Sequence, residues 1–165
     1  MTVTAVRKDA NALTMTLDAE FDASPERVWQ LWADPRQLER WWGPPGYPAT
    51  FTKHDLAPGS RVEYHMTTPE GEKPRGWWKF TAIDAPRKLE FDDGFADESG
   101  APVDAMGSAH ATVTLEDAGG RTRMTIMSTF ESEEQMEEMV KMGMEEGMKE
   151  ALGQVDAILA EHART

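Results

Sequence analysis

Histidines and carboxylates are the side chains of this sequence that could act directly on a substrate or a metal. The four histidines stand at positions 54, 65, 110 and 162. Their spacing matches no known metal-ligand motif, so the sequence predicts no metal site. His110 and Glu63 are the best acid–base candidates, but they belong to no recognisable catalytic constellation. The sequence also has no phosphate-binding loop and no nucleophile elbow, so we expect no catalytic residue and no cofactor.

Methionine and tryptophan are unusually frequent, with eleven and six residues in a chain of 165. Such soft and aromatic side chains are typical either of an unusual core or of an apolar ligand pocket. Five methionines lie between Met136 and Met148, close to Gly143 and Gly147. Glycine inside a helix costs about 1 kcal/mol relative to alanine, so these glycines suggest that a ligand or a tryptophan approaches the helix closely. The alternative, in which methionine fills irregular gaps in the core, stays open.

Adjacent tryptophans occur twice. Trp77 and Trp78 fall on a predicted strand and must point to opposite faces, so we expect Trp78, with Phe80, on the cavity face and Trp77 on the outer face. Trp41 and Trp42 precede a Gly-Pro-Pro-Gly turn. Two neighbouring indoles cannot both enter one core, so we expect Trp42 near the mouth of a pocket.

The overall composition excludes several classes of partner. Thirty acidic and seventeen basic residues give a formal net charge of −13, which argues against nucleic acid as a partner. The chain has no cysteine, so disulfides, thiolate catalysis and Cys-ligated zinc are excluded. No segment approaches the roughly 18–20 apolar residues that a membrane span requires, and no secretory signal is recognisable. We therefore expect a cytoplasmic protein without membrane insertion.

Hydrophobic periodicity divides the chain into strands and helices. Residues 13–21 alternate between apolar and polar side chains, which is typical of a half-buried strand. Ser24 and Asp34, each followed by proline, are the N-caps of two short helices, the first of which places Trp29 and Trp32 in the core. Further strands are predicted at residues 50–56, 61–67, 76–84, 88–92, 108–116 and 122–130, and a loop at 93–106.

The last predicted element begins at Ser132, with Gln135 three residues later to complete a capping box. Apolar residues then recur at helical spacing, which predicts one amphipathic helix that ends near His162. This helix is the only element large enough to cover the apolar face of a sheet. The sequence therefore predicts an α+β protein, with a curved antiparallel sheet of about six to seven strands around one long C-terminal helix and two short helices after the first strand. Residues 1–12 are expected to be a flexible N-terminal segment, and residues 13–163 a single domain.

A series of motifs extends over most of the chain. They are Phe21-Asp22-Ala23-Ser24-Pro25-Glu26-Arg27-Val28-Trp29, Asp34-Pro35, Trp41-Trp42-Gly43-Pro44, Pro58-Gly59, Gly71, Gly76 and Pro86-Arg87-Lys88-Leu89. Together they resemble the START-like, or birch-pollen-allergen-like, helix-grip superfamily (SRPBCC) over residues 13–160. Within it they look like the branch of homologues of the C-terminal domain of the heat-shock-protein-90 ATPase activator. The sequence departs from this branch at Met148, where tryptophan is usual, and at Ser60, where a second glycine is common.

The resemblance implies a helix-grip fold but no shared set of catalytic residues. With the excess of methionine and tryptophan, it leads us to expect a non-enzymatic protein that binds a hydrophobic small molecule, such as a lipid, an aromatic metabolite or an isoprenoid. The expected pocket residues are Trp42, Tyr64, Met66, Trp78, Phe80, Phe91, Val113, Met139, Val140, Gly143 and Met148. Two alternatives stay open: a chaperone-associated interaction module, and a polyketide cyclase-like or hydrolytic enzyme. The branch also leaves open a homodimer.

Overall fold

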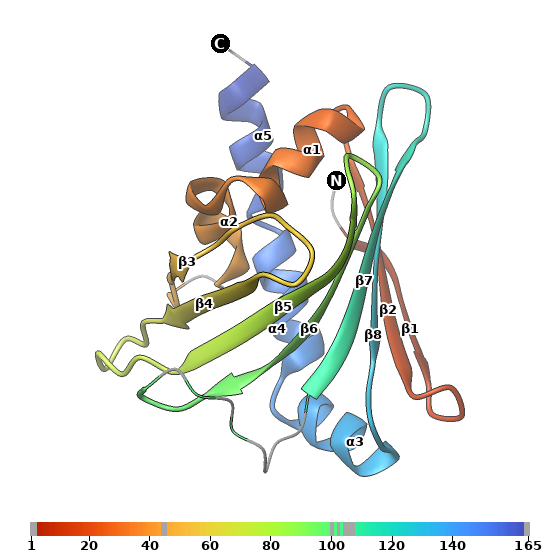
Figure 1. Ribbon diagram of the computed structural model, residues 1–165. Coiled ribbons are helices and arrows are strands. Elements are labelled where there is room, and N and C mark those ends of the chain that lie inside the picture. The colour runs from red at the N-terminus through yellow and green to blue at the C-terminus, as the bar shows by residue number, and fades with distance from the viewer. Residues whose placement is uncertain (1–2, 44–45, 100, 102, 104–107, 164–165) are drawn as a thin grey trace.

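The computed structural model of the protein describes residues 3–43, 46–99, 101, 103 and 108–163. These residues form an eight-stranded antiparallel sheet that curves around the C-terminal helices (Figure 1). The order across the sheet is β1-β2-β8-β7-β6-β5-β4-β3. The strands are β1 (Val3–Asp9), β2 (Thr14–Phe21), β3 (Ala49–Lys53), β4 (Arg61–Met66), β5 (Arg75–Asp84), β6 (Lys88–Ala96), β7 (Ser108–Asp117) and β8 (Thr122–Thr129).

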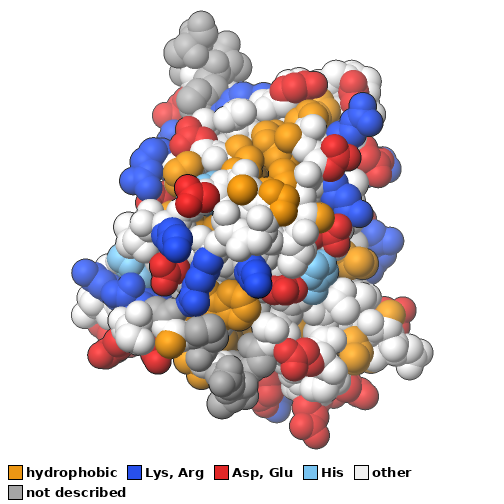
Figure 2. Space-filling view, viewed as in Figure 1, with side chains coloured by type: hydrophobic (Ala, Val, Ile, Leu, Met, Phe, Trp, Pro, Cys, Tyr) orange, Lys and Arg blue, Asp and Glu red, His pale blue; other side chains and the backbone are white. Residues whose placement is uncertain are grey.

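Alternation of side chains gives the sheet an apolar inner face and a polar outer face. In β2 the inward residues Met15, Leu17, Ala19 and Phe21 are all buried, and the residues between them are half-buried. The same alternation is present in β8, where residues such as Met124 and Ile126 are buried. Figure 2 shows Lys, Arg, Asp and Glu side chains interspersed over the face of the molecule seen in Figure 1.

Two short helices, α1 (Pro25–Ala33) and α2 (Pro35–Trp42), follow β2 as the sequence predicts. The Ser24 hydroxyl accepts a hydrogen bond from the Arg27 backbone N–H at 3.3 Å. The Asp34 carboxylate accepts one from the Arg36 N–H at 3.0 Å. Each cap satisfies an N–H group that the first helical turn leaves without a backbone partner. Trp29 and Trp32 of α1 are both buried in the core, as predicted.

The C-terminal region forms three consecutive helices where the sequence predicts one. They are α3 (Glu133–Lys141), α4 (Met144–Leu152) and α5 (Val155–Ala163). Ser132 caps α3 as predicted, accepting a hydrogen bond from the Gln135 N–H at 3.1 Å. The first interruption occurs where Gly143 adopts a φ of +90°, a left-handed conformation that glycine reaches without a Cβ clash. The apolar periodicity continues through both interruptions, which is why it predicts a single helix.

Two further predictions are corrected by the structure. The flexible segment expected at residues 1–12 is wrong for Val3–Asp9, because these residues form β1, which is paired with β2. This edge strand carries Arg7 on its outer face, where the guanidinium pairs with Asp18 at 2.9 Å, and its polar residues conceal the strand pattern. The loop expected from residue 93 begins later, because β6 continues to Ala96.

The fold class itself is confirmed, with one curved antiparallel sheet, two short helices after its second strand, and helices at the C-terminus. Across the described residues, no helix has the length and apolar content needed to cross a membrane.

Candidate functional site

A cavity of about 330 Å³ lies between the inner face of the sheet and the junction of α3 with α4. Most of its lining side chains are aliphatic, aromatic or thioether groups. They are Leu17, Trp32, Trp42, Met66, Phe91, Phe95, Ile126, Phe130, Met139, Met142 and Met148. Ala109 and Ala111 on β7 also line the cavity, and their small side chains leave room that larger residues would fill. Met142 is 57% exposed, so the cavity reaches the surface beside it.

Seven of the eleven predicted pocket residues line this cavity. They are Trp42, Tyr64, Met66, Phe91, Met139, Gly143 and Met148. Trp78, Phe80 and Val113 lie on the inner face but are packed in the core, each at most 1% exposed. The Trp78 ring stacks on Phe91, with 4.3 Å between the ring centroids, and so stands behind the cavity wall. Val140 on α3 is half-buried and does not line the cavity.

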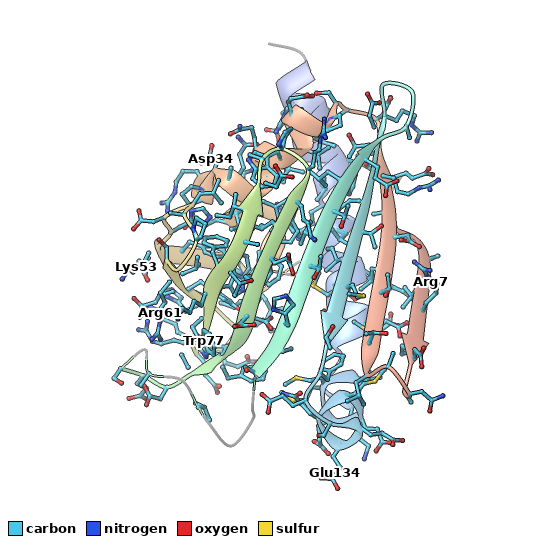
Figure 3. All side chains as sticks on the ribbon, turned by 45° about the vertical axis from the view of Figure 1, so that its right-hand side comes forward. Arg7, Asp34, Lys53, Arg61, Trp77 and Glu134 are labelled. Carbon is cyan, nitrogen blue, oxygen red and sulfur yellow. The ribbon has the colours of Figure 1, made fainter. Side chains whose placement is uncertain are left out.

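The two tryptophans of each pair have different surroundings. Trp41 is fully buried, and its indole N–H donates a hydrogen bond to the Leu31 carbonyl at 3.0 Å. Trp42 is half-buried and lines the cavity. Trp77 lies on the opposite face of β5 from Trp78. The Arg61 guanidinium carbon Cζ is 5.9 Å from the centroid of the Trp77 ring (Figure 3).

In the described part of the structure no tryptophan approaches Gly143 closely, so of the two predicted neighbours only a ligand stays open there, and Gly143 lines the cavity. A Cβ atom at this position would meet nothing within 4 Å, so Gly143 serves the backbone conformation instead. A close approach occurs on the sheet, where a Cβ on Gly76 would overlap the ring of Tyr64. Gly76 is the register partner of Tyr64, and its lack of a side chain lets the phenol lie flat against β5.

Among the described residues that line the cavity, Asp93 is the one with a carboxyl group, and the sequence prediction does not include it. It lies on β6 opposite Ala109 of β7 and lines the cavity. Burial, and to a smaller extent the charge of Asp92, raise the pKa of its carboxyl group from 3.8 to about 7, against an opposite effect of His110. The sequence predicts a loop at residues 93–106, so it does not predict that Asp93 lies on a strand. The alternation of Leu89, Phe91, Asp93 and Phe95 is the signal that could have placed it on the inner face.

Tyr64 is the second polar group of the cavity. Burial raises the pKa of its phenol well above the usual value, and the charge of Asp93 raises it further, so the hydroxyl stays protonated. The indole N–H groups of Trp42 and Trp78 oppose this shift, although both are buried without a hydrogen bond of normal geometry. The cavity is therefore apolar except for a carboxyl group, a neutral phenol and the Ser128 hydroxyl.

The acid–base candidates from the sequence do not face the cavity. His110 lies on the outer face of β7, where its ring nitrogens are 2.8 Å from Asp92 and 3.1 Å from Glu90. Burial alone would lower the pKa of His110, but these carboxylates raise it above its usual value. Glu63 also points outward, paired with Arg61 at 3.9 Å. In the described part of the chain, no group of three or more His, Asp or Glu side chains could hold a metal ion.

Comparison with known proteins identifies the family. The family model described as Activator of Hsp90 ATPase homolog 1-like protein matches residues 22–160. The chain belongs to this family. The predicted resemblance to the helix-grip superfamily is thereby confirmed.

Solved structures of similar chains agree with this assignment to the Activator of Hsp90 ATPase homolog 1-like family. A protein from Arthrobacter aurescens, solved by NMR, is 63% identical with a TM-score of 0.93, and the match covers 97% of this chain and 93% of that one. Protein Ms6760 from Mycobacterium smegmatis is 46% identical with a TM-score of 0.89, covering 95% and 96% of the two chains. A Rhodobacter sphaeroides protein shares the fold at 21% identity, with a TM-score of 0.83 and coverage of 95% and 98%. No curated protein matches the sequence.

Proposed function

We propose that the protein binds an apolar small molecule between the sheet and the junction of α3 and α4. The observation that carries this proposal is the cavity of about 330 Å³ with its largely apolar lining. Pockets that bind small molecules begin at about 300 Å³ and combine apolar walls with a few polar groups. A protein that uses its aromatic and methionine side chains only for the core would fill this space.

The methionines of the helices suit this function. Met139, Met142 and Met148 line the cavity from α3, from the residue that follows it, and from α4. Unbranched thioether side chains change rotamer easily and can pack against ligands of different shapes. The opposite wall is more rigid, because its aromatic rings lie on the sheet and on α1 and α2 and contact one another. Trp32 and Trp42, for example, have ring centroids 6.0 Å apart.

The proposal is tested by filling the cavity. N-phenyl-1-naphthylamine is uncharged at neutral pH, and its fluorescence increases in apolar sites, so it reports binding without using charge. The variant Ala109→Leu extends an aliphatic side chain into the cavity. The matched control, Thr112→Leu, adds a similar side chain to the outer face of the same strand.

We expect saturable binding of one probe molecule to the wild-type protein and to Thr112→Leu. Ala109→Leu should bind the probe at least about tenfold more weakly, because the new side chain displaces part of the probe from the cavity. Each methylene of buried contact that is lost costs about 0.8 kcal/mol. Circular dichroism checks that the variants remain folded. Equal binding by folded Ala109→Leu, or no saturable binding by the wild type, would overturn the proposal.

A further inference from the structure

The charge inside the cavity is of one sign. Among the described residues that line it, Asp93 is the only acidic side chain, and none is Lys, Arg or His. Tyr64, the other titratable lining group, stays neutral because the pKa of its phenol is raised. A carboxylate in a largely apolar cavity is costly unless a positive charge accompanies it.

Asp93 has no such partner within the described chain. Its carboxyl group takes part in no hydrogen bond or ion pair there. Two groups on the outer face of the sheet affect the pKa of Asp93 electrostatically: Asp92 on the same strand raises it, and His110 on β7 lowers it. On β4 the neutral phenol of Tyr64 faces it. The junction of α3 and α4 presents methionine and glycine to the cavity, without a charged group.

Building on the proposed function, we infer that the ligand is an apolar organic cation whose protonated amine pairs with the Asp93 carboxylate. The ammonium group supplies the missing positive charge and donates hydrogen bonds to an oxygen that now has none. The aromatic rings of Trp42 and Phe95 line the same space, and the faces of such rings attract cations. The hydrocarbon part then lies against the methionines and alanines of the cavity.

Other polar groups fit this cavity less well. A ligand carboxylate or phosphate would bring a second negative charge beside Asp93 and would meet no cation. A neutral hydroxyl could donate a hydrogen bond to the Asp93 carboxylate, or accept one from its protonated form, but it would leave the negative charge of the ionised carboxylate uncompensated. The raised pKa of Asp93, about 7, is consistent with a buried carboxyl group that lacks a cationic neighbour.

The inference is tested with three probes of equal chain length: decylamine, 1-decanol and decanoate. Titration calorimetry at pH 8 measures their affinities for the wild-type protein, for Asp93→Asn and for Glu63→Gln. Asp93→Asn keeps the shape of the side chain and removes its charge. Glu63→Gln is the matched control, since it removes a carboxylate from the outer face of β4.

We expect decylamine to bind the wild type and Glu63→Gln about tenfold or more tightly than 1-decanol, with decanoate weakest. In Asp93→Asn this preference should disappear. The affinity of the wild type for decylamine should also rise about tenfold from pH 6 to pH 8, because the ionised fraction of Asp93 rises from about a tenth to nine tenths around its pKa of about 7. The amine itself remains protonated over this range, since an alkylamine has a pKa near that of lysine, about 10.4.

The possible failures are distinguishable. Tighter binding of 1-decanol or decanoate, or an unchanged preference for decylamine in Asp93→Asn, overturns the inference and leaves an apolar binding site in place. If none of the three probes binds and Ala109→Leu also leaves N-phenyl-1-naphthylamine binding unchanged, the proposed function itself fails. The pH profile of the wild type needs no variant, so the inference stays testable if Asp93→Asn does not fold.

Discussion

Replacing Asp93 with asparagine is expected to stabilise the protein without ligand, by an amount that increases with pH. Burial raises the pKa of this carboxyl group from 3.8 to about 7 in the folded protein. The unfolded chain therefore releases the proton at lower pH than the folded protein does. Protonation of Asp93 therefore contributes to the free energy of unfolding. This contribution is fully present below about pH 3.8, is lost as the pH rises to about 7, and is absent above that value.

The size of the effect follows from the two pKa values. With 3.8 and about 7, ionisation of Asp93 lowers the free energy of unfolding by about 2.3 kcal/mol at pH 5.5 and about 4.3 kcal/mol at pH 8.5. Asparagine does not ionise, so the variant avoids this loss. The difference in free energy of unfolding between variant and wild type should therefore grow by about 2 kcal/mol between the two pH values. Asp93 is half-buried, and screening of its charge by solvent makes this figure an upper limit.

The assay is urea denaturation at pH 5.5, 7.0 and 8.5, followed by tryptophan fluorescence and circular dichroism. The control is Glu63→Gln, whose carboxylate is exposed on the outer face of the sheet. Its difference from the wild type should stay constant over the pH range. If the difference for Asp93→Asn is also constant, or if this variant is the less stable one at pH 8.5, the carboxyl group is not penalised by burial and the reasoning is refuted.

Substitutions at two glycines test the backbone arrangement around the site. Gly76→Ala should lower the free energy of unfolding by about 1–3 kcal/mol in urea denaturation, because the new methyl group would overlap the Tyr64 ring, whose Cε1 lies 2.8 Å from it. An equal loss in a Tyr64→Ala background would contradict this clash. Gly143→Ala should cost about 1–3 kcal/mol by the same measurement although its Cβ meets nothing, since φ is +90° there. Gly143→Asn should cost less, because asparagine tolerates the left-handed region, and equal losses for the two variants would argue against backbone strain as the cause.

The parts of the fold that follow from local chemistry were predictable. The N-caps at Ser24, Asp34 and Ser132 precede helices, because each side chain supplies an acceptor to the first turn. The alternation in residues 13–21 predicts the orientation of β2, since a strand can bury only every second side chain. Six of the seven expected pocket residues that share one cavity lie on inward positions of strands or in the C-terminal helical region, and the seventh, Trp42, lies at the end of α2.

The parts that depend on tertiary structure were not predictable in the same way. Trp78 and Phe91 both face inward, but only their mutual stacking decides that Phe91 borders the cavity and Trp78 stands behind it. Asp93 was missed because an acidic residue next to Gly94 is typical of a loop, whereas the pairing of β6 with β7 extends the strand through both residues. The volume left beside Ala109 depends on how far the helices stand from the sheet, which sequence periodicity does not determine.

The interruption at Gly143 separates two mechanical roles within the C-terminal helices. Ala151 and Leu152 of α4, and Val155, Ile158 and Leu159 of α5, are buried and anchor this part of the chain in the core. In α3, which borders the mouth of the cavity, Met136 is the one side chain that is buried. If α3, α4 and α5 formed one continuous helix, moving α3 away from the cavity would also move α4 and α5. The buried side chains of all three helices would then have to leave the core together. With the break at Gly143, entry of the proposed ligand would require only the nine-residue helix α3 to move, while α4 and α5 stay in place.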